Sequence, residues 1–391
     1  MIAKIALPRV LRIGGGAFKE TGQLLQTLGL RAPLIVTDAF FTKQGLADRL
    51  SEILEQSDIG AVVFSGSVPD PTTSSVDAGL EALRHGTFDS VIGLGGGSSI
   101  DTAKAIAILN VHGGKMRDYK APHQQDIPGL PIVAIPTTAG TGSEATRFTI
   151  VTDEETGEKM LCIGLAYLPT AAIVDYELTL SKPMRLTADT GVDSLTHAIE
   201  AYVSKLANPF ADGFALTAMR AIWKNLPTAY FDPQNRPARE AMMLAATQAG
   251  IAFSNSSVAL VHGMSRPIGA KFHVPHGLSN AMLLPAVTLF SIAAAKTRYA
   301  DCARAMAIAS DDADDDRATR TLVESLQKLN QQLAVPTPSQ YGIAKSDWFG
   351  SLPTMAKQAL ASGSPANNPR VPTAEEIEEL YREVWEGDSK Q

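Results

Sequence analysis

Aspartate and histidine residues occur in this chain at the spacing of a metal site. Asp193 and His197 lie four residues apart where the pattern predicts the opening of a helix, so both side chains would project from one face. His262, His273 and His276 follow beside Gly and Pro, and four of the seven histidines fall in this stretch. Imidazole with carboxylate suits a divalent transition metal. An Asp/His pair alone is common on a solvated helix face, but the concentration of histidines favours a metal site.

Two glycine-rich turns, each after an apolar run, predict a nucleotide site. Residues 95–97 are three glycines whose bare backbone can approach a pyrophosphate, although Ser98 replaces the third Gly of the usual dinucleotide fingerprint. Ser98 and Asp101 form a capping-box-like start to a helix, and the N-terminus of a helix attracts anions. A second cluster of glycine and hydroxyl residues spans 136–144. A plain tight turn explains the first cluster alone, but two such clusters at strand ends favour a nucleotide.

Asp38 ends an apolar run where the ribose of a dinucleotide commonly lies. A carboxylate there accepts hydrogen bonds from both ribose hydroxyls and repels a 2'-phosphate, which favours NAD over NADP. The structural alternative is that Asp38 only caps the following helix.

The periodicity of apolar residues changes in the middle of the chain. Strands and helices alternate in the first half, which predicts an α/β domain with a parallel sheet of Rossmann-like type over residues 1–180. The second half predicts an all-α domain over 181–391. Strands are expected at 10–13, 33–38, 61–64, 90–94 and 131–135, with helices at 18–28, 46–56 and 76–84 and then at 193–204, 211–225, 238–252, 280–307, 317–333 and 374–385. The metal site is expected in the cleft between the domains, facing the glycine turns.

Composition excludes several classes of function. The chain has 391 residues, 45% of them hydrophobic, and a net charge of -7, with no segment that concentrates Lys and Arg, so nucleic acid is not an expected partner. The two cysteines form no CxxC motif, and no secretory signal is visible, which favours a cytoplasmic protein. The apolar stretch 278–295 contains Ser279, Asn280 and Pro285, so a buried helix is expected there and no membrane span.

Several long motifs, in order along the chain, resemble the iron-containing (group III) alcohol dehydrogenase family. They are GGGSSIDTAK at 95–104, PTTAGTGSE at 136–144, Asp193 within the helix that carries THAIEAY at 196–202, HGM at 262–264, PHG at 275–277 and NPR at 368–370. The resemblance implies a dinucleotide-binding α/β domain, a helical domain and a divalent metal. The implied metal ligands are Asp193, His197, His262 and His276. The implied cofactor-binding residues are Asp38, Asp70, Gly96, Gly97, Ser98, Asp101, Thr137, Thr138, Ser143, Lys159 and Leu178.

The expected activity is hydride transfer between an alcohol and NAD, with an aldehyde or ketone as the oxidised product. The expected cofactors are NAD, with NADP as the alternative, and Fe²⁺, with Zn²⁺ or another divalent ion as the alternative. Partners are a small alcohol or aldehyde substrate and a second copy of the chain in a homodimer. Neither nucleic acid nor a membrane is expected to bind.

Arg266 departs from the family pattern, which often has His four residues after the third ligand. A guanidinium stays protonated and cannot relay a proton, so Arg266 is expected to contact the substrate or to form a salt bridge. His273 could take over part of the relay, and these two residues are the candidate catalytic groups.

Three alternatives remain open at this point. A lyase of the dehydroquinate-synthase type shares the two-domain plan, but such a lyase binds its anionic substrate through several Lys and Arg, which the metal region lacks. A zinc polyol dehydrogenase of the glycerol-dehydrogenase type is a rival among the oxidoreductases. A non-enzymatic binding module is the third.

Overall fold

A computed structural model describes residues 2–386 of the chain. The chain divides into two compact units, Lys4–Ser181 and the segment from Lys182 onward. Each unit buries apolar side chains of its own.

A six-stranded parallel sheet forms the centre of the first unit, in the order β1-β8-β5-β4-β2-β3. The strands are β1 (Val10–Ile13), β2 (Pro33–Asp38), β3 (Val62–Ser67), β4 (Ser90–Gly95), β5 (Ile132–Pro136) and β8 (Ala171–Val174). The helices are α1 (Thr21–Leu28), α2 (Ala39–Lys43), α3 (Leu46–Glu55), α4 (Thr73–Arg84) and α5 (Gly97–His112). Parallel strands require crossovers, and these helices provide most of them. The predicted α/β class is confirmed.

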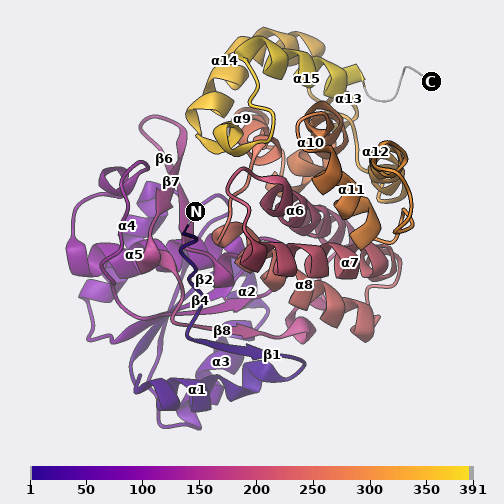
Figure 1. Ribbon diagram of the computed structural model, residues 1–391. Coiled ribbons are helices and arrows are strands. Elements are labelled where there is room, and N and C mark those ends of the chain that lie inside the picture. Colours follow the sequence, from indigo (N-terminus) through magenta and orange to yellow (C-terminus); the bar gives the residue numbers. More distant parts are fainter. Residues whose placement is uncertain (1, 387–391) are drawn as a thin grey trace. The chain divides into compact units, whose positions relative to one another are not determined.

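Helices cover both faces of this sheet. Successive side chains of a strand point to opposite faces, so Leu34 and Val36 of β2 pack with α4 and α5 whereas Ile35 packs with α1 and α3. Figure 1 shows these two pairs of helices on opposite sides of the strands. A strand buried on both faces needs apolar residues at every position, which explains the unbroken apolar runs in the sequence.

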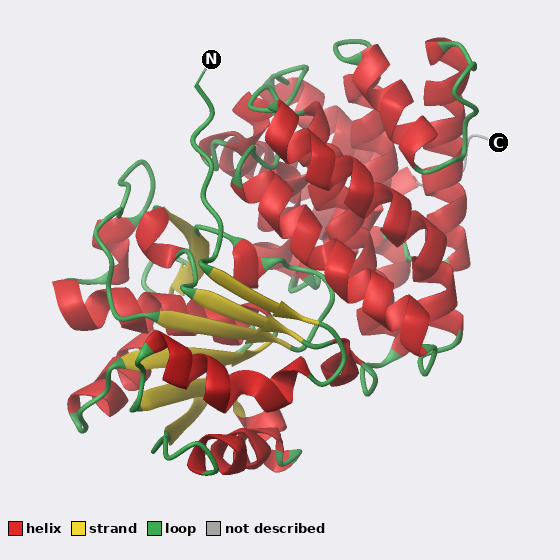
Figure 2. Cartoon of the chain, turned by 60° about the horizontal axis from the view of Figure 1, so that its bottom comes forward, coloured by secondary structure: helices red, strands yellow, loops and turns green. Residues whose placement is uncertain are grey.

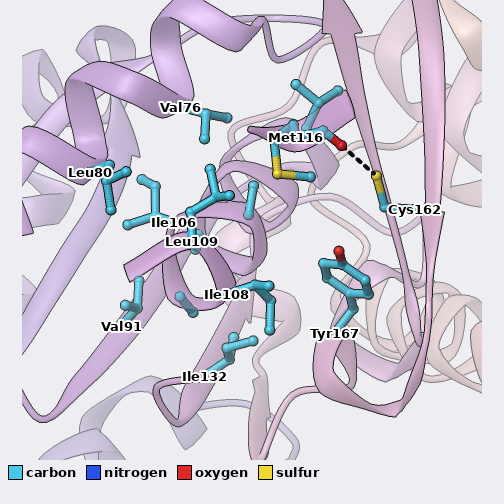
Figure 3. Close-up of a cluster of buried hydrophobic side chains, with 14 of the residues drawn as sticks. Val76, Leu80, Val91, Ile106, Ile108, Leu109, Met116, Ile132, Cys162 and Tyr167 are labelled. Atoms are coloured by element: carbon cyan, nitrogen blue, oxygen red, sulfur yellow. Dashed lines mark hydrogen bonds between the residues drawn. The ribbon is translucent and has the colours of Figure 1, made fainter. Parts of the chain in front are cut away.

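The apolar cluster on the α4 and α5 side is the larger core of this unit (Figure 3). Val76 and Leu80 of α4 lie in it with Ile106 of α5. The Sγ of Cys162 donates to the backbone oxygen of Met116 at 3.9 Å. Burial raises the pKa of this thiol to about 12, so Cys162 is a packing residue without nucleophilic character at neutral pH.

An antiparallel hairpin of β6 (Phe148–Asp153) and β7 (Glu158–Ile163) is joined to α5 by a buried lysine. The Nζ of Lys104 donates to the backbone oxygens of Thr146 at 3.0 Å and Phe148 at 2.8 Å. Burial lowers the pKa of Lys104 to about 8, although Asp101 and Glu144 oppose the shift. Neither this hairpin nor β8 was predicted from the sequence.

The second unit consists of helices and loops, and the described residues 182–386 contain no strand (Figure 2). The helices are α6 (Met184–Val203), α7 (Pro209–Phe231), α8 (Arg236–Ser254), α9 (Leu260–Phe272), α10 (His276–Ile292), α11 (Lys296–Ala305), α12 (Asp315–Gln332), α13 (Pro338–Tyr341), α14 (Lys345–Ala361) and α15 (Ala374–Glu386). Helices α6, α7 and α8 pack against one another, and α6 also packs against α10. The predicted helical class of this half is confirmed.

Two helix predictions differ most from the structure in their bounds. Asp193 does not open a helix, because α6 starts at Met184 after Pro183 as N-cap. The predicted helix 280–307 is two helices, α10 and α11, separated by residues 293–295. Those three residues are alanines, which carry no stop signal in the sequence. No helix among residues 2–386 is both long and apolar enough to cross a membrane.

Candidate metal and cofactor sites

Three helices of the second unit bring predicted metal ligands together. Asp193 lies in α6, His262 in α9, and His276 is the first residue of α10. The Nε2 atoms of His262 and His276 lie 3.5 and 3.6 Å from Oδ1 of Asp193. The ligand atoms of all three residues lie within 4.8 Å of one another. Asp193 and His262 are buried and His276 is partly exposed.

His197, the fourth predicted ligand, lies beside these three residues but outside the group whose ligand atoms are all within 4.8 Å of one another. Its Nε2 is 3.8 Å from Oδ1 of Asp193, one turn back along α6. Its ring stacks on His262, with centroids 4.5 Å apart, and on Phe253 at 4.3 Å. The stacking fixes the plane of the imidazole, so its Nε2 is held on the side of the Asp193 carboxylate.

The donor set fits a divalent ion. Two atoms that each bind a tetrahedral ion at about 2.1 Å lie about 3.4 Å apart. The distances from Oδ1 of Asp193 to the three imidazole nitrogens, 3.5 to 3.8 Å, are of this order. One carboxylate and three imidazoles suit Fe(II), Zn(II), Co(II) or Mn(II).

Burial and charge act against each other at this cluster. Burial raises the pKa of Asp193, but His197, His276 and His262 outweigh it and hold this pKa well below its ordinary value. Burial lowers the pKa of His262, whereas the carboxylates of Glu200 and Asp193 outweigh burial and raise this pKa to about 9. The two carboxylates therefore favour a cation at the imidazole, either a proton or a metal ion.

A glycine allows α10 to approach α6 closely. A Cβ added at Gly277 would lie 2.2 Å from the backbone oxygen of Asp189 and 3.3 Å from Cβ of Asp193. Backbone atoms cannot rotate away from such a clash. The loop before α10 is only residues 273–275, and His273 ends α9 in the left-handed conformation with φ 54°. The short loop keeps the two helices neighbours, and Gly277 sets the distance between α10 and α6.

Two buried residues that the sequence analysis missed contact the predicted ligands. Glu200 accepts from Nδ1 of His262 at 2.7 Å. The Nδ2 of Asn280 donates to Oδ1 of Asp193 at 2.6 Å and lies 3.3 Å from Nε2 of His276. Both lie three or four residues after a predicted ligand on the same helix, so helical spacing places them on the ligand-bearing face but does not give their partners.

In the first unit, the start of α5 fits a phosphate group. Gly96 is the N-cap and no side chain caps the helix, so the N–H groups of the first turn and the positive end of the dipole can attract an anion. A Cβ at Gly96 would meet nothing closer than Thr138 at 3.8 Å. The buried Oγ1 of Thr137 has no hydrogen-bond partner among residues 2–386. The backbone is therefore open to a ligand at the position where the pyrophosphate was expected.

The capping box predicted from Ser98 and Asp101 was wrong. Ser98 lies within the first turn of α5, and Asp101 accepts from Oγ of Ser143 at 2.6 Å and from the backbone N–H of Ile150 at 3.0 Å. Burial raises the pKa of Asp101, with the charge of Lys104 opposing the shift. Asp101 is drawn away from the helix start because its buried carboxylate needs donors, and it joins α5 to the second glycine-rich segment.

Other predicted cofactor residues also have partners within the first unit. Lys159 pairs with Asp70 at 2.8 Å. Oδ1 of Asp38 accepts from the backbone N–H of Phe41 at 3.0 Å and so caps α2, which is the structural alternative named from the sequence. Leu178 packs against the core on the α1 and α3 side. This cap occupies only Oδ1 of Asp38. The negative charge of the carboxylate stays at the end of β2, where the ribose was expected.

Arg266, the first candidate catalytic residue, lies in the middle of α9, and His273, the second, is the C-cap of this helix. Arg266 follows His262 by one turn, and its Nη1 donates to the backbone oxygen of Ser362 at 3.5 Å. Burial lowers the pKa of Arg266 to about 10, partly opposed by Glu200, so the side chain stays cationic at neutral pH. The backbone oxygen of His273 accepts from Tyr341 at 3.3 Å.

Comparison with known proteins covers nearly the whole chain. Residues 8–176 match the family model of the iron-containing alcohol dehydrogenases, and residues 187–385 match the model of the C-terminal part of the Fe-containing alcohol dehydrogenase family. The chain belongs to the iron-containing alcohol dehydrogenase family. The resemblance inferred from the motifs is confirmed.

Individual relatives support the same assignment. The chain is 36% identical to an NAD-dependent methanol dehydrogenase of Bacillus methanolicus, over 96% of this chain and 98% of that one. It is 36% identical to a 1,3-propanediol dehydrogenase of Citrobacter freundii, over 97% of this chain and 98% of that one. The crystal structure of a 1,3-propanediol oxidoreductase superposes with a TM-score of 0.94 at 34% identity, over 98% and 100% of the two chains. That of a sulfoacetaldehyde reductase from Bifidobacterium kashiwanohense with NAD⁺ gives 0.88 at 30% identity, over 98% and 99%.

This iron-containing alcohol dehydrogenase is therefore an oxidoreductase that interconverts alcohols with aldehydes or ketones. The family uses a divalent metal and a nicotinamide dinucleotide. The comparisons do not favour the lyase or the polyol-dehydrogenase alternative, and the assignment as an enzyme excludes the binding module.

The close contact at Gly277 generates a first prediction. Gly277→Ala should weaken metal binding by about ten-fold or more, because the added Cβ pushes α10 and His276 away from Asp193. Metal content is measured by elemental analysis and affinity by competition with a chelator. Gly350→Ala in α14 is the matched control, because a Cβ there meets nothing within 4 Å. Wild-type metal affinity in Gly277→Ala would contradict this role of the glycine.

Proposed function

We propose that this protein is an NAD-dependent, iron-containing alcohol dehydrogenase whose metal ligands are Asp193, His197, His262 and His276. The observation that carries the proposal is the convergence of the three imidazole nitrogens on Oδ1 of one buried carboxylate, at 3.5 to 3.8 Å. Iron is proposed over zinc because the donor set accepts either ion and the family is the iron-containing one.

The ligands would act by holding charge in fixed positions. Asp193 and the three histidines would hold a divalent ion, which would supply a positive charge that lowers the pKa of an alcohol hydroxyl or polarises a carbonyl. The single carboxylate among the four ligands leaves a net positive site, which suits an oxygen that becomes negative. Stacking of His197 on His262 and Phe253 keeps the imidazoles in place during this change.

The cofactor proposal rests on the first unit. Residues of this unit would hold a nicotinamide dinucleotide, which would supply the acceptor for the hydride of the alcohol carbon. The uncapped start of α5 and the open backbone at Gly96 would hold the pyrophosphate, with Thr137 and Thr138 beside it. Asp38 would face the ribose. The remaining proposed cofactor residues are Asp70, Gly97, Ser98, Asp101, Ser143, Lys159 and Leu178. Among these, Asp101 and Ser143 would act by holding the second glycine-rich segment against α5.

A short primary alcohol or diol is the proposed substrate class. Two relatives are named for methanol and for 1,3-propanediol. We further propose a cytoplasmic location, which agrees with two free, buried thiols, Cys162 and Cys302. The homodimer stays a prediction that light scattering can check.

The proposed metal site predicts the outcome of removing one ligand. His262→Ala should lose bound metal and nearly all alcohol oxidation, with a circular dichroism spectrum close to that of wild type. Metal is measured on protein purified without chelators, and NADH formation is measured with a panel of alcohols and diols. His85→Ala, on an exposed side chain of the first unit, is the control and should keep both. Full metal occupancy in His262→Ala would refute the ligand assignment.

The charge of Asp38 predicts cofactor choice. Asp38→Asn keeps a residue that caps α2 well and removes only the charge. We expect the ratio of kcat/KM with NADP to kcat/KM with NAD to rise by about ten-fold or more, because a like-charge clash with the 2'-phosphate disappears. A wild type that already prefers NADP would show that Asp38 does not face the ribose.

Arg266 predicts that the protein also accepts a short hydroxyacid, beside the proposed neutral alcohols. The cationic side chain one turn from His262 would attract a carboxylate, and it cannot pass a proton. Arg266→Gln and Arg266→His should both lower kcat/KM for a short hydroxyacid relative to a neutral alcohol of equal length. Only Arg266→His should make kcat/KM depend on pH near neutrality, because imidazole titrates there. In the wild type, His273 would be the residue available to relay a proton.

If neither the preference nor the pH profile changes in these two variants, Arg266 acts only through its bond to Ser362. Metal content serves as the check that both variants keep the metal site.

A further inference from the structure

A second buried carboxylate, Glu200, lies between α6 and α9. Its Oε2 accepts from Nδ1 of His262 at 2.7 Å and from the backbone N–H of Ala259 at 2.7 Å. Its Oε1 accepts from the backbone N–H of Val261 at 2.6 Å. The side chain is about 4% exposed, so these three donors take the place of water.

These contacts make Glu200 the cap of a helix other than its own. Ala259 is the N-cap of α9 and has no side chain that can bond the free N–H groups. Glu200 reaches across from α6 and satisfies two of them, and its negative charge lies at the positive end of the α9 dipole. The start of α9 is thereby fixed relative to α6, three residues before α9 presents His262.

The contact between Glu200 and His262 determines which nitrogen of His262 carries the proton. A carboxylate only accepts hydrogen bonds, so Nδ1 must carry the hydrogen that is shared with Glu200. In the neutral ring, Nε2 is then without a proton, and Nε2 is the atom 3.5 Å from Oδ1 of Asp193. The nitrogen that faces the proposed ion is the one with a free lone pair.

We propose that Glu200 is a positioning residue of the metal site, which fixes both the tautomer of His262 and the place from which α9 presents it. The inference rests on the proposed metal site and adds a residue that does not itself bind the ion. In this role Glu200 raises metal affinity without touching metal, cofactor or substrate.

The variant Glu200→Gln tests whether Glu200 acts through its hydrogen bonds or only through packing. Glu200→Gln keeps the size and most of the shape, but it has one oxygen where three donors need two. Any orientation of the amide places an N–H group against the backbone N–H of Ala259 or Val261. If the amide nitrogen of the glutamine faces His262, Nδ1 of His262 must accept a hydrogen bond. Nε2 of His262 then carries the proton and has no lone pair for a metal ion.

The test is the metal affinity of Glu200→Gln, measured by competition of Zn²⁺ or Fe²⁺ with a chelator at constant pH. We expect a dissociation constant about 10 to 100 times that of wild type. The matched control is Asp175→Asn, because Asp175 is another buried carboxylate that accepts from two backbone N–H groups, of Phe18 and Glu177, in the first unit. Asp175→Asn is expected to lower the melting temperature and leave the metal dissociation constant within about two-fold of wild type.

An unchanged metal affinity in a folded Glu200→Gln protein, with a lowered melting temperature, would overturn the inference and leave Glu200 as a helix cap only. If wild type binds no metal, the proposed function fails as well. The two failures are therefore distinguishable.

A measurement on the unmutated side chain of Glu200 keeps the inference testable if Glu200→Gln does not fold. Nitrogen-15 spectra of histidine-labelled, Zn²⁺-loaded protein report which ring nitrogen carries hydrogen, and sequence-specific assignment, extended from the backbone to the ring, identifies the signals of His262. Hydrogen on Nδ1 with metal on Nε2 is the expected result. Metal on Nδ1 of His262 would overturn the inference, because that atom would not be available to Glu200.

Discussion

The burial of the Asp193 carboxylate is the constraint on which the centre of the helical unit depends. A buried carboxylate costs free energy unless donors or cations surround it. Here Asn280 donates at 2.6 Å and imidazoles of α6, α9 and α10 lie within 3.8 Å. One residue on α6 thus requires two other helices to converge on it, and Gly277 gives α10 the space to do so. The same convergence produces a donor set for a divalent ion.

Helix α6 carries the groups of this centre on one face. His197 follows Asp193 by four residues and Glu200 follows it by seven, which is one and two turns. Asp193 faces the proposed ion and Glu200 holds the ligand on α9, so two carboxylates on one helix have different tasks. Two buried charged side chains of α5 have a similar structural role in the first unit. Asp101 accepts from Ser143 and so holds the second glycine-rich segment against α5. Lys104 donates to the start of β6 and holds that strand against α5.

The sequence was informative where periodicity and residue chemistry act locally. The apolar runs of β2 and β4 predicted buried parallel strands, and the Asp193/His197 spacing predicted two side chains on one face of a helix. The loop that joins the ligand-bearing helices α9 and α10 contains Pro275, a visible signal in the sequence. By contrast, the alanines at 293–295 end α10 without a helix-stopping residue, and α6 starts well before its chemically distinctive part.

Contacts that depend on distant segments could not be predicted from the sequence. Ser98 and Asp101 have capping-box spacing, but Asp101 instead meets Ser143 and Ile150, about 40 and 50 residues away along the chain. Glu200 meets the start of α9 across a similar separation. Local rules could not choose between these outcomes, because the choice is made by burial of the carboxylate in the folded unit.

X-ray absorption at the metal edge, on wild-type protein purified without chelators, would show whether Asp193 and the three histidines bind a metal ion. We predict a first-row divalent ion, with iron expected, whose nearest neighbours are nitrogen and oxygen at about 2.0 to 2.2 Å and whose outer scattering is that of imidazole rings. Sulfur neighbours at about 2.3 Å, or metal only at trace level, would contradict a site built from Asp193 and the three histidines.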